Sequence, residues 1–96
     1  MSLNQKLTHL IKGRTIQDLE MNPSKVSLRF SDGSTMQVKV MESNSPPLKN
    51  GVSGIFEQST LLRILCEDES QLTLTLADPG SSVTLRDATG AVEYLG

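Results

Sequence analysis

Apolar and polar side chains alternate in three stretches of the chain, Lys25–Phe30, Thr35–Met41 and Gln71–Ala77. A period of two residues places every second side chain on one face, which is the pattern of a half-buried β-strand. The apolar face of these stretches comprises Val26, Leu28, Phe30, Met36, Val38, Val40, Leu72, Leu74 and Leu76. The pattern therefore predicts three strands that share one buried side.

Further strands are expected where the alternation is less regular. Residues 15–21 form an apolar and polar mixture in which Ile16 and Leu19 break the period, so this strand should contain a β-bulge. Residues 58–66 hold an almost continuous apolar run that favours a buried strand, with a short helix as the alternative. Residues 82–86 and 91–95 complete the set.

Turn residues separate the predicted strands. Asp32-Gly33 is a hairpin signal, since glycine readily takes the positive φ angles of tight turns. Asn22-Pro23-Ser24, Asp78-Pro79-Gly80-Ser81 and Ala88-Thr89-Gly90 are further turns. The spacing predicts antiparallel hairpins throughout.

The two halves of the chain match each other at an offset of 46 residues, which becomes 47 after Pro79. The matched pairs include Ile16 with Leu62, Val26 with Leu72, Leu28 with Leu74, Asp32 with Asp78 and Gly33 with Gly80. We interpret this as a tandem repeat of a three-stranded unit; the alternative is that any two alternating hairpins align in this way.

The first 13 residues predict a helix, because Leu3, Leu7, Leu10 and Ile11 form one apolar stripe at helical spacing. Ser2 is the expected cap, and Gly13 suits the residue that ends a helix. A helix this short is marginal in isolation, so its stripe should dock on the sheet or on a second subunit.

These elements predict a single, mainly β domain over residues 1–96. It comprises an N-terminal helix (1–13), a first antiparallel meander (14–41), a connecting loop (42–54), and a second meander with a C-terminal strand (55–96). A three-stranded meander has one apolar face that must be covered. Two such meanders should therefore form a small sandwich or an open barrel.

Composition narrows the class of protein. The chain is 36% hydrophobic with three aromatic residues, so its core is thin and a homodimer would add buried area. The single cysteine, Cys66, forms no internal disulfide, and no apolar run is long enough to cross a bilayer. We therefore expect a cytoplasmic protein without a membrane partner.

The chemistry-bearing residues are few. His9 lies opposite the leucine stripe and is expected in solvent, while Cys66 ends an apolar run. Glu67-Asp68-Glu69 is typical of a solvated turn. Metal sites need clustered histidine, cysteine and carboxylate ligands, and the glycines match no phosphate-binding fingerprint. The sequence predicts no catalytic, cofactor or metal site and no enzyme activity.

What remains is interaction with another molecule. Pro46 and Pro47 lie in the polar loop, and Val52, Ile55 and Phe56 place apolar side chains beside it. With a neighbouring strand edge, these five residues are the predicted partner-binding site; the alternative is that Ile55 and Phe56 only close the core.

The leading hypothesis is a non-enzymatic protein-interaction or accessory module that self-associates. Two alternatives remain, a small barrel that binds nucleic acid and a domain that senses a small ligand. The net charge of −2 and the scarcity of aromatic residues disfavour nucleic acid. No residue pattern points to a small molecule.

Overall fold

The computed structural model describes residues 2–42 and 51–96, and this part of the chain forms nine antiparallel strands and one helix. The first half contains β1 (Ser2–Leu3), α1 (Gln5–Ile11), β2 (Ile16–Asn22), β3 (Lys25–Phe30) and β4 (Thr35–Glu42). The second half contains β5 (Val52–Gln58), β6 (Leu61–Cys66), β7 (Gln71–Leu76), β8 (Val83–Arg86) and β9 (Val92–Leu95). The predicted mainly β architecture with one N-terminal helix is confirmed.

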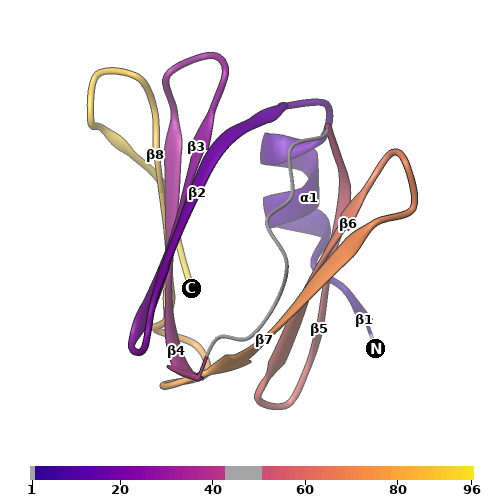
Figure 1. Ribbon diagram of the computed structural model, residues 1–96, viewed down its shortest axis with the longest axis vertical. Coiled ribbons are helices and arrows are strands. Elements are labelled where there is room, and N and C mark those ends of the chain that lie inside the picture. The colour runs from indigo at the N-terminus through magenta and orange to yellow at the C-terminus, as the bar shows by residue number, and fades with distance from the viewer. Residues whose placement is uncertain (1, 43–50) are drawn as a thin grey trace.

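The strands form a curled, half-open barrel in which β4 belongs to two sheets. One sheet has the order β1-β5-β6-β7-β4, and the other has the order β2-β3-β4-β8-β9. The first part of β4 pairs with β8, from Thr35 to Val38, and its end pairs with β7 at Val40. Figure 1 shows the resulting V, in which the sheets join where β7 meets β4 and α1 lies between them at the wide end.

The core fills the space between the two sheets. The three predicted apolar faces all point into it, and Phe30 is its largest fully buried side chain. The alternation of 61–66 is also strict, because Leu62, Ile64 and Cys66 are buried while Leu61 is exposed. The predicted strand in this segment is therefore confirmed and the helical alternative is excluded.

The predicted helix is shorter than the apolar stripe suggested. It begins at Gln5, because the side chain of Asn4 accepts a hydrogen bond from the amide of Leu7 (3.0 Å) and so caps the helix in place of Ser2. Ser2 and Leu3 instead pair with Glu57 and Phe56 of β5. Pairing across the sheet thus prevails over the helical spacing of Leu3.

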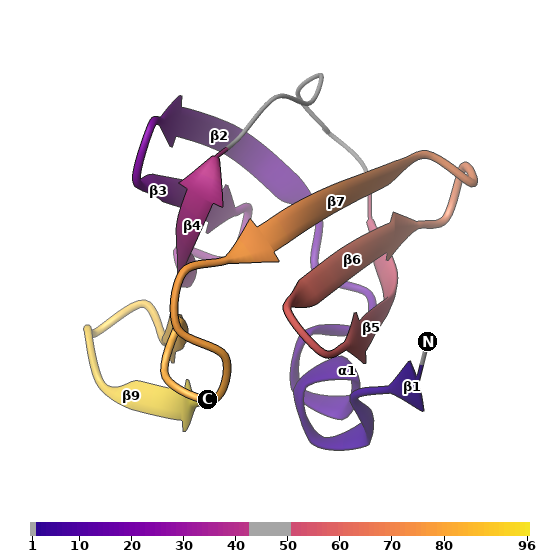
Figure 2. The same cartoon turned by 90° about the horizontal axis from the view of Figure 1, so that it is seen from below.

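The second meander is built from different strands than predicted. Residues 52–58, placed partly in the connecting loop, form the full strand β5, and the consecutive meander is β5-β6-β7. β8 pairs with β4 and β9 instead of continuing from β7. The chain bends away at the end of β7 (Figure 2), and β8 then pairs in the other sheet. The two halves therefore do not share one pairing scheme.

Three turns share one hydrogen-bonding pattern. In the turns that start at Phe30, Cys66 and Asp87, the amide of the first residue donates to the carbonyl four residues later, and its carbonyl accepts from the amide three residues later. The fourth residue of each turn has a positive φ, at 90° for Gly33, 71° for Glu69 and 92° for Gly90. Glu69 therefore occupies a position that its two counterparts fill with glycine.

Replacing Glu69 with glycine should stabilise the protein. An L-residue in the left-handed region costs about 1–2 kcal/mol, and glycine avoids this cost. Part of the gain is offset, because glycine loses more conformational entropy on folding than other residues do. We expect Glu69→Gly to raise the free energy of unfolding by about 1 kcal/mol in a urea titration. Glu67→Gly, in the same turn without a positive φ, should lower it; a loss of stability in both variants would contradict the argument.

Aspartates in these turns make stability depend on pH. Hydrogen bonds from the hydroxyls of Ser34, Ser70 and Thr89 lower the pKa values of Asp32, Asp68 and Asp87 respectively. A carboxyl with a lowered pKa in the folded state contributes stability above its unfolded pKa, about 4, and this stability is lost as pH falls through the folded pKa.

We therefore expect the thermal midpoint to be flat near neutral pH and to fall steadily below about pH 4. Ser70→Ala removes the serine hydroxyl that donates to Asp68, so the decline between pH 4 and pH 2 should become shallower. Unfolding monitored by circular dichroism across this range provides the measurement. An identical acid limb in the variant would show that this hydrogen bond does not couple to folding.

Candidate functional site

The predicted partner-binding residues are separated by the fold. Val52 and Ile55 have no exposed surface and belong to the core, so their side chains offer nothing to a partner. Phe56 is half-buried and points to the outer face of β5, where it lines a hollow with Arg63, Leu65 and Gln71. Pro46 and Pro47 lie outside the described residues. Of the three members that the structure describes, Phe56 alone therefore reaches a surface.

The strand edges distinguish a different candidate. An edge strand presents backbone groups that can pair with another chain. Of the strands that the structure describes, β1, β2 and β9 pair along one side only, and β2 is the longest of them at seven residues.

The edge of β5 is covered by the N-terminal segment. The amide of Asn4 donates to the carbonyl of Ile55 (2.8 Å), and the amide of Gly13 donates to the carbonyl of Val52 (2.8 Å). Between them, the hydroxyl of Thr8 accepts from the amide of Ile55 (2.9 Å) and donates to its carbonyl (3.3 Å). This edge is therefore occupied by the chain itself.

The side chains of β9 are held by the same N-terminal region. Tyr94 accepts a hydrogen bond from Nδ2 of Asn4 (3.0 Å), and Nζ of Lys6 lies 5.9 Å from the centre of its ring. Both terminal nitrogens of Arg14 donate to the carboxylate of Glu93 (2.9 and 3.2 Å), and this pairing raises the pKa of the arginine. The short edge of β9 is accordingly flanked by α1 and the residues around it.

The outer edge of β2 has no such cover among residues 2–42 and 51–96. β2 pairs with β3, and the pairing shifts register between Ile16 and Asp18, where the sequence predicted a bulge. A further backbone bridge joins Thr15 to Gly51, just before the strand begins. β2 lies at the end of the strand order, next to β3, and Figure 1 shows it running from the top of the molecule to the hairpin with β3 at the lower left. We call the side of residues 16–21 that faces away from β3 the β2 edge.

The two faces of β2 differ in chemistry. Leu19 and Met21 are half-buried against the core, opposite Leu28 and Val26 of β3. Asp18 and Glu20 are exposed on the other face, opposite Arg29 and Ser27. The β2 edge thus presents alternating carboxylates and apolar side chains.

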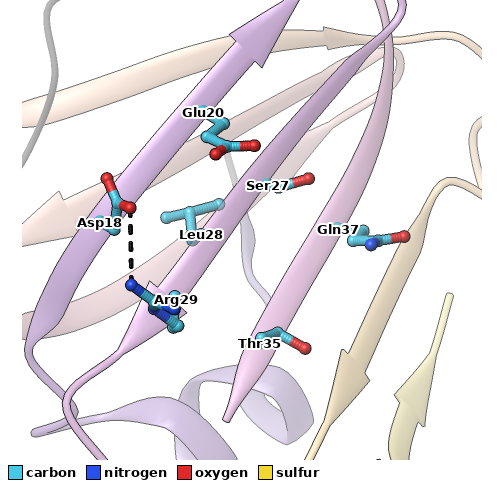
Figure 3. A pocket seen from close by; sticks show the side chains of 7 residues that line it. All are labelled: Asp18, Glu20, Ser27, Leu28, Arg29, Thr35 and Gln37. Atoms are coloured by element: carbon cyan, nitrogen blue, oxygen red, sulfur yellow. Dashed lines mark ion pairs between the residues drawn. The ribbon is translucent and has the colours of Figure 1, made fainter. Parts of the chain in front are cut away.

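The carboxylate face borders a shallow hollow of about 200 Å³ on the outside of the sheet (Figure 3). Its lining comprises Asp18, Glu20, Ser27, Leu28, Arg29, Thr35 and Gln37. Figure 3 places the two acids on β2, along one border, with Ser27 and Arg29 on β3 and Thr35 and Gln37 on β4. A strand added to the β2 edge would extend this face.

The charges in the hollow are only weakly compensated. Oδ2 of Asp18 lies 3.7 Å from Nη2 of Arg29, and both side chains are more than half exposed. Exposed pairs of this kind contribute about 0–1 kcal/mol. Glu20 forms no ion pair within the described part of the chain. The border of the hollow therefore retains an acidic character.

The backbone at Leu19 is also available at this edge. Its amide donates to Oδ1 of Asp18, the side chain of the preceding residue, at 3.0 Å. A hydrogen bond within an exposed residue pair is exchanged at low cost for one to an incoming carbonyl. This amide can therefore serve a second strand.

The residues with catalytic chemistry are dispersed. His9 is exposed on α1, while Cys66 is 2% exposed, and burial raises the pKa of its thiol. No three histidine, cysteine or acidic side chains gather into a metal site among the described residues. Within the same residues, no helix has the length and apolar character needed to cross a membrane.

Sequence reasoning did not identify the β2 edge. The alternation of Asp18, Leu19, Glu20 and Met21 was available as a signal, but any half-exposed strand carries it. Which strand lies at a margin depends on long-range pairing. Comparison with protein-family models, curated proteins and solved structures finds no match to this chain.

Proposed function

We propose that this chain is a non-enzymatic protein-interaction module that binds an extended segment of another protein at the β2 edge. The observation that carries this proposal is a seven-residue strand that pairs on one side only within the described residues, while the edge of β5 is occupied by residues 4–14. Extended segments add to such edges through backbone hydrogen bonds, and alternate side chains provide specificity.

Half-buried apolar side chains support a partner at this edge. Leu19 and Met21 contact the core from the margin of the sheet and remain partly in water. An added strand would cover them from its own inward-facing side. Each buried methylene then contributes about 0.8 kcal/mol, so the covered area favours binding in addition to the backbone bonds.

The placement of the aromatic residues favours a protein segment over nucleic acid. Single-stranded nucleic acid needs aromatic side chains on which bases stack, within a basic groove. Phe30 is fully buried, Phe56 lies on the other sheet, and Tyr94 is half-buried beside Asn4 and Lys6. The β2 edge has acids in place of such a platform.

Selection from a displayed library of random heptapeptides tests the proposal. Peptides that bind should slow hydrogen exchange of the backbone amides of residues 16–22, as measured by NMR. Leu19→Pro removes the amide that faces Asp18 and should abolish their binding, because proline cannot donate to an added strand. Leu19→Val keeps the amide and should retain binding. Selected peptides that leave the 16–22 amides unprotected would overturn the proposal.

A further inference from the structure

Resting on this proposed function, we infer that the β2 edge takes a segment in which basic and apolar residues alternate. We further infer that Asp18 and Glu20 keep a second copy of the chain away from it. Both acids are exposed on one face of β2, and both point toward the hollow of Figure 3. Residues directly opposite each other on antiparallel strands interact, favourably for opposite charges and unfavourably for like charges.

The pairing of β2 with β3 shows the chemistry that this strand accepts. Arg29 lies opposite Asp18 and Leu28 lies opposite Leu19, so polar and apolar residues alternate along β3 as well, with a basic side chain beside Asp18. The same faces continue to the free side of β2. A partner that matches both faces would therefore place lysine or arginine beside the acids and an aliphatic residue beside Leu19.

Glu20 makes the preference for a basic partner stronger than Asp18 alone would. Arg29 partly compensates Asp18 from β3, at 3.7 Å, whereas the described residues provide no ion pair for Glu20. Ser27, its neighbour across the strand pair, is uncharged. A basic side chain of the partner would accordingly find an uncompensated carboxylate at this position.

A second copy of the same strand meets repulsion in the three antiparallel registers centred on Asp18, Leu19 and Glu20. An antiparallel pair of β2 strands centred on Leu19 sets Asp18 of each copy against Glu20 of the other. A pair centred on Asp18 or on Glu20 sets that acid against itself. Directly opposed like charges oppose pairing, so the edge rejects its own copy while it accepts a basic segment.

The first experiment reverses one charge. In Glu20→Lys, the register centred on Leu19 replaces two repulsive contacts with two attractive ones between Asp18 and the new lysine. We expect dimerisation about tenfold or more tighter than that of the wild type in sedimentation equilibrium. The double variant Asp18→Lys with Glu20→Lys restores like charges and should return to the monomer. Equal association of all three proteins would overturn the exclusion of a second copy.

The second experiment uses two blocked heptapeptides, one alternating valine with lysine and one alternating valine with glutamate. The wild type should bind the lysine peptide about tenfold more tightly and protect the amides of residues 16–22, and the double lysine variant should reverse the preference. Glu67→Lys with Glu69→Lys changes the net charge equally in the β6–β7 turn and should leave the preference unchanged.

The outcomes separate the two proposals. Equal binding of both peptides, with protection of the β2 amides, overturns the basic preference and leaves the interaction edge in place. A lysine preference that the control pair abolishes as strongly as the β2 pair assigns the effect to net charge and overturns the inference. If neither peptide protects residues 16–22 and Glu20→Lys remains monomeric, the edge does not accept a strand, and the proposed function fails as well.

Discussion

Phe30→Ala should remove about 3–5 kcal/mol from the free energy of unfolding. Phe30 ends β3, pairs with Ile16 and has no exposed surface, and it is the largest fully buried side chain of the core. Truncation to alanine loses the transfer free energy of the ring and leaves a cavity that the two sheets close only in part. A domain of 96 residues has a total free energy of unfolding of about 5–14 kcal/mol. The substitution should therefore remove a large part of the stability at 37 °C.

Urea unfolding followed by circular dichroism measures this loss. Phe56→Ala is the matched control, because its ring is half-buried on the outer face of β5 and much of it remains in water when the protein folds. We expect its cost to be less than half of that of Phe30→Ala. Comparable losses would show that the outer face of β5 is covered in solution, and would revive the predicted role of Phe56 in binding.

The local patterns in the sequence predicted most of the strands. Strict alternation identified β3, β4 and β7, because each of these strands has one face in the core and one in water. Turn chemistry also transferred well, since Gly33 takes the positive φ that the Asp32-Gly33 signal indicates. These features depend on residues within a few positions of each other, which is why the sequence reveals them.

Features that depend on distant pairing were missed. β5 contains Ser53-Gly54 in its interior and a register shift there, so its sequence resembles a loop. Its strand character comes from β6 on one side and from the N-terminal segment on the other. The partner of β8 lies about 50 residues earlier, at Thr35 paired with Arg86, and no periodicity specifies such a choice.

The same limit applies to the candidate site. Acids at positions 18 and 20 are ordinary on any solvent-facing strand. They indicate a binding edge only because β2 lies at the margin of its sheet. The apolar residues that the sequence favoured, Val52 and Ile55, prove to be core. An edge is defined by what is missing beside it, so the complete set of pairings has to be known first.

Among the described residues, the edge of β5, unlike that of β2, is covered by the N-terminal segment of the chain. Residues 2–14 supply one hydrogen bond after another to β5, through the backbone of β1, Asn4 and Gly13 and through the side chain of Thr8. Such cover prevents a second chain from pairing there. The contrast with β2 is therefore a property of the fold, to which both the backbone of residues 2–14 and the hydroxyl of Thr8 contribute.

Thr8→Val tests this arrangement and should cost about 2–3 kcal/mol. The hydroxyl of Thr8 accepts a hydrogen bond from the amide of Ile55 (2.9 Å) and donates to its carbonyl (3.3 Å), and both residues are buried. Valine has nearly the same shape and a similar helix propensity, so the packing of α1 is preserved. The carbonyl of Ile55 keeps its hydrogen bond from the amide of Asn4. The amide of Ile55, which is buried away from water, is left without a hydrogen-bond partner.

Thr8→Ser provides the control, since serine keeps the hydroxyl and loses only a methyl group, at a cost of about 1 kcal/mol. We expect the valine variant to unfold at lower urea than the serine variant, and its amide at Ile55 to exchange faster than that of the wild type. A valine variant as stable as the wild type would mean that the edge of β5 is held by the backbone of residues 2–14 alone, and that the helix does not help to close it.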